Sequence, residues 1–190
     1  MSDRILAPLC ALGKDVPEIT TIGNITIKEN PDCTIISLAE RQGRATDLKK
    51  ALDHVLAEGL PGPGRANLAI DISTIWTGNG QWFLTAPLPK YDNFAKEIKD
   101  MVAGTASIAE QTDGWVVFDI IGDGLIPFLE RLCNINSKIM NNGDVTRTVI
   151  EHLGCLIICR ESGRSFTIIS PRSSAVSLHH TLMATAKSIS

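Results

Sequence analysis

The fold is decided by three adjoining segments, Cys155-Leu-Ile-Ile-Cys-Arg160, Glu161-Ser-Gly-Arg164 and Ser165-Phe-Thr-Ile-Ile-Ser170. The first and the third are short and rich in β-branched residues, and the polar segment between them contains Gly163. Two such runs joined by a glycine-containing turn are typical of a β-hairpin. Pro171 ends the second strand, because proline has no N–H to donate to a strand ladder.

A helix is expected directly after this hairpin. Ser173 or Ser174 can provide its N-cap. Apolar residues then recur at spacings of three and four, which places them on one helix face: Ala175, Leu178, Leu182 and Ala186. The segment 144–187 therefore predicts a strand pair that leads into one amphipathic helix.

The rest of the chain repeats this organisation. Hydrophobic periodicity and the Gly/Pro clusters between the periodic segments predict further strands and helices: strands over 33–38, 68–76, 81–85 and 115–121, and helices over 46–58, 91–102 and 123–133. Both halves read strand, helix, strand, turn, strand, helix. This order predicts an α+β fold of two ferredoxin-like βαββα units, each an antiparallel sheet with helices packed on it.

The same patterns suggest a division of the chain. Residues 1–32 are expected to form an extended N-terminal arm, because glycines and prolines interrupt them and their apolar side chains need cover from the body or from a partner chain. Residues 33–103 form the first ferredoxin-like half and residues 104–190 the second, within one compact domain. The segment 104–113 could add a strand that bridges the halves.

Composition excludes several classes of function. The 190 residues carry a formal net charge of -3, with a pI of about 5.8, and show no cluster of Lys and Arg that would bind nucleic acid. No uncharged apolar run reaches the roughly 18 residues of a membrane helix, and the N-terminal residues lack the apolar core of a secretory signal. A soluble cytoplasmic protein is predicted, with neither nucleic acid nor membrane as a partner.

The five cysteines are predicted to be reduced and buried. None belongs to a Cys-x-x-Cys pair, and an odd number argues against a disulfide framework. Cys155 and Cys159 fall on one strand face with Ile157 between them, but four residues of strand span about 13 Å, which is too far for one metal ion. No metal site is predicted.

No catalytic or cofactor site emerges either. Gly122-Asp-Gly124 stands between a predicted strand and a predicted helix, yet Pro127 replaces the third glycine of a phosphate loop and Asp123 would repel a phosphate, so Asp123 is predicted to cap the helix. His179 and His180 point about 100° apart on their helix, which favours solvent or an interface. No serine is marked as a nucleophile by its neighbours.

The three tryptophans, Trp76, Trp82 and Trp115, stand at strand ends in a chain with few aromatic residues. Tryptophans in such places usually anchor a core. Tryptophan is also enriched at interface hot spots, so a partner surface is an alternative. His152 is predicted to lie in a strand, as a core histidine or as a ligand contact.

Several motifs together resemble the gamma subunit of heterotetrameric sarcosine oxidase. They are, in chain order, Trp76-Thr-Gly78-Asn-Gly-Gln81-Trp82-Phe-Leu84, Gln111-Thr-Asp-Gly114-Trp115, then Thr148, His152 and Arg160, and finally Arg172-Ser173. That family is similar in fold to the folate-binding domain of the glycine-cleavage T-protein. On this resemblance Trp76, Trp82, Trp115, His152 and Arg172 are the candidate interface residues.

The resemblance implies a role in an assembly of four chains. That enzyme oxidises sarcosine to glycine with O₂ as acceptor, forms H₂O₂ and passes the one-carbon unit to tetrahydrofolate. FAD, FMN, NAD, tetrahydrofolate and zinc would be held by the alpha, beta and delta subunits. This chain would be a non-catalytic structural subunit that packs against them and holds no cofactor.

Other functions stay open at this stage. Asp123 stands where the family tends to have proline, so the oxidase could act on another N-methyl amine. A free-standing folate-dependent aminomethyltransferase would need a second, carboxy-terminal domain. A small-ligand or folate-binding regulatory module that acts without partner chains would also fit two ferredoxin-like units.

Overall fold

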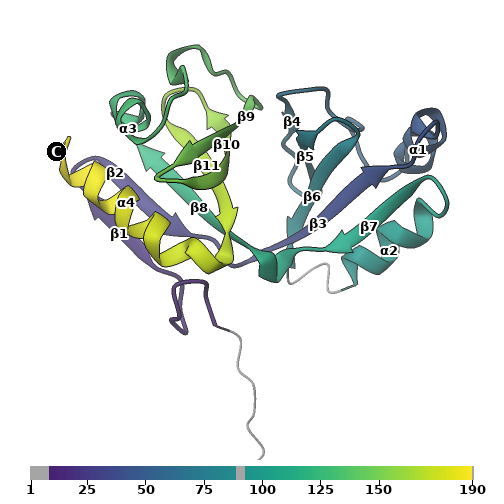
Figure 1. Cartoon of the computed structure of the whole chain (residues 1–190), viewed down its shortest axis with the longest axis horizontal. Coiled ribbons are helices and arrows are strands. Elements are labelled where there is room, and N and C mark those ends of the chain that lie inside the picture. The colour runs from purple at the N-terminus through teal and green to yellow at the C-terminus, as the bar shows by residue number, and fades with distance from the viewer. Residues whose placement is uncertain (1–8, 89–92, 190) are drawn as a thin grey trace, which may run out of the picture.

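The computed structural model describes residues 9–88 and 93–189 as four layers, in which two antiparallel sheets face each other and helices cover their outer faces (Figure 1). The predicted α+β class is confirmed. The four α-helices of the described residues are α1 (Ala45–Leu52), α2 (Phe94–Met101), α3 (Leu125–Leu132) and α4 (Ala175–Lys187). Short 3-10 helices that lie wholly within the described residues are η2 (Thr112–Gly114), η3 (Ser137–Ile139) and η4 (Arg172–Ser174).

The five-stranded sheet has the strand order β4-β5-β6-β3-β7. It carries α1 and α2 on its outer face, where their apolar faces pack on Ile36, Leu38 and Leu84. The helices α1 and α2 thus close one end of the molecule. The strands are β3 (Cys33–Glu40), β4 (Ala66–Asn67), β5 (Ser73–Gly78), β6 (Gln81–Pro87) and β7 (Ala106–Glu110).

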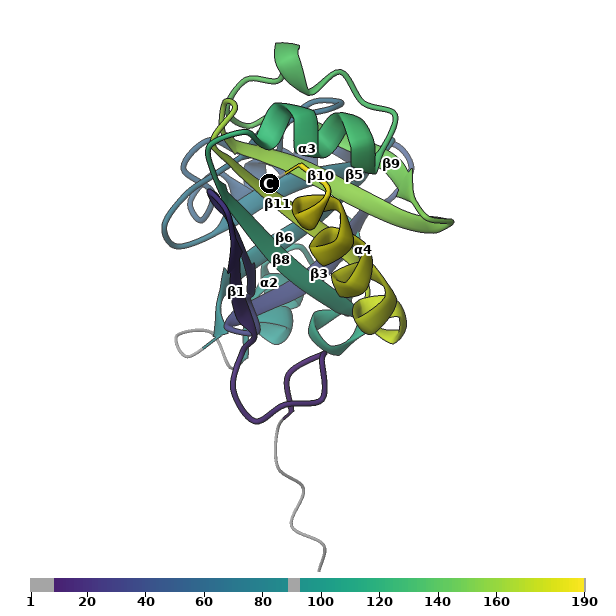
Figure 2. The same ribbon diagram turned by 90° about the vertical axis from the view of Figure 1, so that its left-hand side faces the viewer.

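The six-stranded sheet has the order β1-β2-β8-β11-β10-β9. Figure 2 shows α3 and α4 on its outer face, where they bury Phe118, Ile157 and Phe166. The predicted hairpin is present as β10 and β11, in which Leu156 pairs with Ile169. Both strands lie inside the sheet, between β8 and β9. The strands are β1 (Ile19–Ile22), β2 (Ile25–Glu29), β8 (Trp115–Gly122), β9 (Val145–Ile150), β10 (Leu153–Glu161) and β11 (Ser165–Pro171).

A third apolar cluster joins the two sheets. Ile75 and Phe83 of the five-stranded sheet meet Leu156, Ile158 and Ile169 of the six-stranded sheet. Alternate residues of each central strand therefore serve two cores, one under the helices and one between the sheets. This explains why the central strands read as continuous apolar runs.

The predicted N-terminal arm is wrong in part. Residues 1–8 of it lie outside the described residues, but its later residues form β1 and β2, and β2 pairs with β8 from Ile25↔Gly122 to Glu29↔Phe118. In the six-stranded sheet β2 takes the place that β7 takes in the five-stranded sheet, next to the first strand of the unit. Residues 19–29 thus complete the second unit, because an unpaired edge of β8 would expose its backbone groups.

The segment 104–113 also has a different place from the one predicted. Its strand β7 pairs with β3, from Ile36↔Glu110 to Glu40↔Ala106. It is the edge strand of the five-stranded sheet, so it belongs to the first unit and does not bridge the two. The divisions at residues 32 and 103 therefore do not coincide with sheet membership.

The predicted strand over 68–76 begins too early. Residues 68–72 form a bend, in which the Ser73 hydroxyl donates to the Ala69 carbonyl at 3.0 Å and accepts from the Ala69 N–H at 3.1 Å. Ile70 is consequently 94% exposed. The alternation of Leu68, Ile70 and Ile72 had suggested a strand. Instead, the Ser73 side chain makes the hydrogen bonds that a neighbouring strand would otherwise make to the Ala69 backbone.

Three helix expectations also need correction. The helix expected over 46–58 ends at Leu52, and turns that precede Gly59 follow it. The helix expected from Asp123 has Gly124 as its N-cap, at φ 85°, while the Asp123 carboxylate pairs with Arg164 at 3.3 Å. Ser174, one of the two predicted residues, is the N-cap of α4, but its side chain makes no capping hydrogen bond.

Candidate interaction surfaces

The five candidate interface residues fall at three separate places. Trp115 and Arg172 line one cavity, and Trp76 and Trp82 line another. His152 lies apart from both, in the turn between β9 and β10. The structure therefore divides the predicted set into two pairs and one single residue.

The first cavity, which we call the Arg172 cavity, has a volume of about 350 Å³. It lies where the N-terminal segment, the connection from β2 to β3, and the start of β8 meet, at the lower end of the molecule in Figure 1. Its apolar wall includes Pro31, Ile35, Trp115 and Val117. This volume is near the lower limit of small-molecule sites.

Trp115 forms the inner wall of this cavity. Its ring packs edge-on against Phe83, with centroids 5.1 Å apart and an interplanar angle of 65°. Its indole N–H donates to Gln111 Oε1 at 3.2 Å. Since Phe83 belongs to the five-stranded sheet and Trp115 to the six-stranded sheet, this aromatic pair fixes the sheets against each other beside the cavity.

Arg172 and Glu29 hold the N-terminal segment over the cavity. Arg172 donates from Nη2 to the Leu9 carbonyl at 2.5 Å. The buried Glu29 carboxylate accepts from the backbone N–H groups of Leu12 at 3.2 Å and Glu18 at 3.3 Å. Sequence reasoning missed Glu29, although an acidic residue in the alternating pattern of β2 was a signal for a buried polar anchor.

Replacing Glu29 by alanine is expected to lower the free energy of unfolding by about 2–4 kcal/mol, because two backbone N–H groups lose a charged acceptor. Glu29→Gln should lose about half as much, since its amide retains one acceptor oxygen. Urea unfolding measures both. The control Lys28→Ala removes an exposed side chain of the same strand and should change little. Equal losses for Glu29→Ala and Lys28→Ala would show that Glu29 anchors nothing.

The thiols at the Arg172 cavity are unsuited to nucleophilic chemistry. Burial, aided by the charge of Glu29, raises the pKa of the Cys10 thiol. Burial also raises the pKa of Cys33 to about 11. Both stay protonated near neutral pH, and the thiolate is the reactive form. All five cysteines are free; Cys10, Cys155 and Cys159 are buried as predicted, whereas Cys33 and Cys133 are only partly buried.

The second cavity, which we call the tryptophan groove, lies at the turn between β5 and β6. Trp76 and Trp82 face each other across these strands, and Trp82 Nε1 donates to the Pro61 carbonyl at 2.8 Å. Glu40 and Asn79 lie at its rim, and its volume is about 410 Å³. The Trp82 ring also packs on the core under α1 and α2, so it anchors this end of the sheet.

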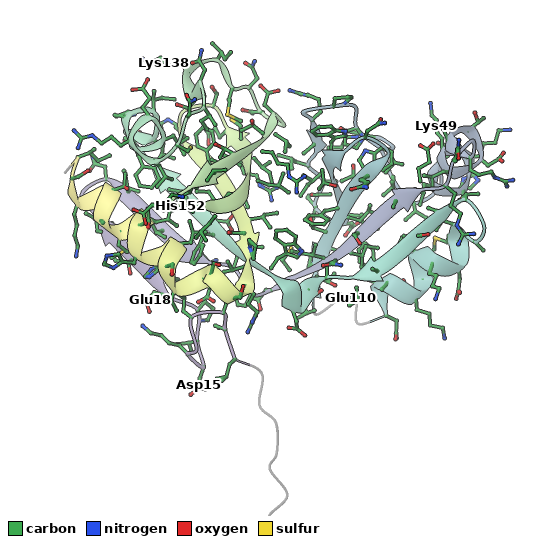
Figure 3. The ribbon with its side chains drawn as sticks, in the orientation of Figure 1. Asp15, Glu18, Lys49, Glu110, Lys138 and His152 are labelled. Atoms are coloured by element: carbon green, nitrogen blue, oxygen red, sulfur yellow. The ribbon has the colours of Figure 1, made fainter. Side chains whose placement is uncertain are left out.

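His152 does not lie in a strand. Glu151 and His152 are the two central residues of the β9–β10 turn, with φ of 44° and 71°. This is the backbone of a tight hairpin turn, in which both residues need positive φ. The His152 side chain is exposed at this turn (Figure 3), so it belongs to no core.

His179 is half-buried, whereas its neighbour His180 is exposed. The His179 ring stacks on Phe118 with centroids 5.7 Å apart, and its Nε2 is buried without a hydrogen-bond partner among the described residues. Burial lowers the pKa of His179, against the opposing charges of Glu18 and Glu29. The adjacent histidines therefore point to different environments, as expected for neighbours on a helix.

Stability is expected to fall as the pH is lowered through and below 6.5, the usual pKa of histidine. Below this pH the histidine of the unfolded chain binds a proton more readily than His179 of the folded chain. The stability that neutral His179 contributes is therefore fully present only above that pH. Urea unfolding at pH 7.5 and 5.5 measures the difference. The variant His179→Asn should show a smaller difference, and an unchanged one would exclude His179 as its source. The lowered pKa of Glu18 acts only below its usual 4.5.

The six-stranded sheet also carries a polar chain that sequence reasoning missed. Asp119 accepts from Asn30 Nδ2 at 2.9 Å and from the Thr167 hydroxyl at 2.6 Å, and that hydroxyl accepts from Arg160 Nε at 3.0 Å. Only the strand register brings these residues together.

Within residues 9–88 and 93–189, no group of three or more His, Cys, Asp and Glu residues could hold a metal ion. In the same residues no helix is long and apolar enough to cross a membrane.

Comparison with known proteins shows the fold. No family model matches the chain, and no curated protein matches its sequence. A chain of the heterotetrameric sarcosine oxidase from Corynebacterium sp. U-96, in complex with pyrrole 2-carboxylate, is similar in structure with a TM-score of 0.73 and 16% identity. The match covers 90% of this chain and 88% of that one. The likeness is one of fold.

The glycine cleavage system aminomethyltransferase T from Bartonella henselae is similar as well, with a TM-score of 0.64 and 12% identity. That match covers 86% of this chain but only 46% of the aminomethyltransferase. This chain thus spans less than half of the length of that enzyme. The shared fold is the one that the sequence motifs had suggested.

Proposed function

We propose that this chain is a non-catalytic structural subunit of a cytoplasmic multi-chain oxidase that demethylates sarcosine or a related N-methyl amine. The observation that carries the proposal is the match over nearly the full length of both chains, 90% of this one and 88% of the one from the sarcosine oxidase. The matched chain is part of a heterotetrameric assembly, and a likeness of fold over nearly its whole length supports a similar place for this chain in an assembly.

The chemistry of the described residues supports a non-catalytic role. The thiols at the Arg172 cavity are held protonated, and Glu29 and Arg172 are engaged in holding the N-terminal segment. In this proposal the reaction uses O₂ as acceptor, forms H₂O₂ and delivers the one-carbon unit to tetrahydrofolate. FAD, FMN, NAD, tetrahydrofolate and zinc then belong to the alpha, beta and delta subunits.

The chain purified alone is expected to be colourless and inactive with sarcosine. The same chain, tagged in its native host and purified gently, should bring down three other chains and a flavin spectrum. A visible spectrum and mass-spectrometric identification of the co-purifying chains measure this. Stoichiometric flavin on the isolated chain would contradict the proposal, and so would a tagged chain that comes out alone.

The Arg172 cavity favours one second candidate function, that of a small-ligand or folate-binding regulatory module without partner chains. Its volume and apolar wall suit a small ligand. Thermal unfolding in the presence of folates and amino acids separates the two, because a ligand that binds only the folded state raises the midpoint. A flat response to all of them removes the second candidate.

A further inference from the structure

We infer that the Arg172 cavity and its apolar rim form the surface on which a partner subunit docks, through a segment that carries Lys or Arg between apolar residues. This inference rests on the proposed function, which requires a partner. It adds the surface of this chain that the partner contacts and the chemical character of the docking segment. Three properties of the described residues carry it.

The first property is an apolar rim that is exposed among the described residues. Leu9 is 50% exposed, Val16 68% and Leu88 37%. Leu9 and Leu88 line the Arg172 cavity, and Val16 lies between Asp15 and Pro17, which line it too. Exposed apolar residues grouped around a hollow mark an interaction site, whereas single ones are ordinary.

The second property is an excess of negative charge. Among the described residues, the lining contains four carboxylates against one guanidinium, and Glu29 and Arg172 already hold the N-terminal segment. Asp15, Asp32 and Asp113 are exposed, and within the described residues none of them makes an ion pair or a side-chain hydrogen bond. A docking segment with a cationic side chain complements these carboxylates.

The third property is the contrast with the tryptophan groove. None of the large apolar residues exposed on the described surface lines that groove, and the Trp82 N–H is already satisfied by Pro61. The tryptophan groove therefore lacks the exposed apolar area that a partner would bury. An apolar centre with a charged surround is the usual anatomy of an interface.

The position of the Arg172 cavity leaves room for a large partner. In Figure 3, Asp15 projects at the lower end of the molecule, on the loop that precedes β1, while Lys49 and Lys138 lie at the far end. The helices cover the outer faces of the two sheets (Figure 1), so a chain that approaches from below meets the rim and no helix. A small ligand would fill the cavity but leave Val16 exposed, so a polypeptide segment fits better.

The test places a photo-crosslinking amino acid at Val16 in the tagged chain, and at Lys49 of α1 as a matched exposed control. The assembly is irradiated after gentle purification, and the linked peptides are identified by mass spectrometry. We expect Val16 to link to one partner segment that contains Lys or Arg among apolar residues, and Lys49 to link only at background. Val16 at background, equal linking at both positions, or a segment without a cation would overturn the inference.

Charge reversal tests the electrostatic step in the same complex. The double variant Asp32→Lys, Asp113→Lys should weaken association about tenfold, because like charges across an interface repel. Asp100→Lys, at an exposed carboxylate of α2 outside the cavity, should leave association unchanged. Equal affinities for the two variants would contradict the charge complementarity.

The outcomes separate the inference from the proposed function. If the assembly forms but Val16 links to nothing, the docking surface is wrong and the subunit role stands. If no partner accompanies the unmodified tagged chain, the subunit role fails and the docking surface fails with it.

Discussion

Replacing Gly122 by alanine is expected to lower the free energy of unfolding by more than about 3 kcal/mol. Gly122 ends β8 at φ 147°, a conformation that side chains rarely adopt. A Cβ there would lie 1.9 Å from the Asn24 carbonyl oxygen, so the backbone of the β1–β2 turn would have to move. Such a contact with backbone cannot be relieved by a rotamer change.

Gly163→Ala is the matched control. Gly163 also has positive φ, at 71°, but a Cβ there meets nothing within 4 Å. Its cost should be only the left-handed backbone strain of about 1–2 kcal/mol. Urea unfolding of both variants compares the two. Equal losses of stability would mean that the Gly122 variant is destabilised only by its strained backbone, and that the clash with the Asn24 carbonyl adds nothing.

Gly122 also illustrates which part of the fold the sequence could predict. Local patterns predicted the hairpin of β10 and β11, the helices and the apolar central strands, because each depends on neighbours in the chain. The pairing of β2 with β8 depends on residues about 90 positions apart. No local pattern specifies such a partner, so residues 1–32 were predicted as an arm although part of them is a strand of the second unit.

The candidate site shows the same limit. Tryptophan and arginine are conspicuous by residue type, and Trp115 and Arg172 indeed line the same cavity. Asp32 and Asp113 are ordinary acidic residues in the sequence, and only the fold brings them to one place. His152 was misplaced because the turn between β9 and β10 contains no glycine, the residue that usually marks positive φ.

The last prediction concerns Phe118, whose replacement by alanine is expected to cost about 3–5 kcal/mol. Phe118 is fully buried beneath α4 on the outer face of β8. Ile121→Ala on the same strand should cost less than about 1 kcal/mol, because Ile121 is 49% exposed. Urea unfolding measures both, and similar losses would mean that α3 and α4 cover the sheet without packing on Phe118.

The Phe118 variant has a second readout that separates packing from general loosening. His179 stacks on the Phe118 ring, and burial lowers the pKa of His179. When the ring is removed, water reaches the imidazole and its pKa should rise toward the usual 6.5. NMR titration of the histidine signals in the folded variant measures this. An unchanged His179 pKa would show that α4 itself, rather than the Phe118 ring, keeps water from the imidazole.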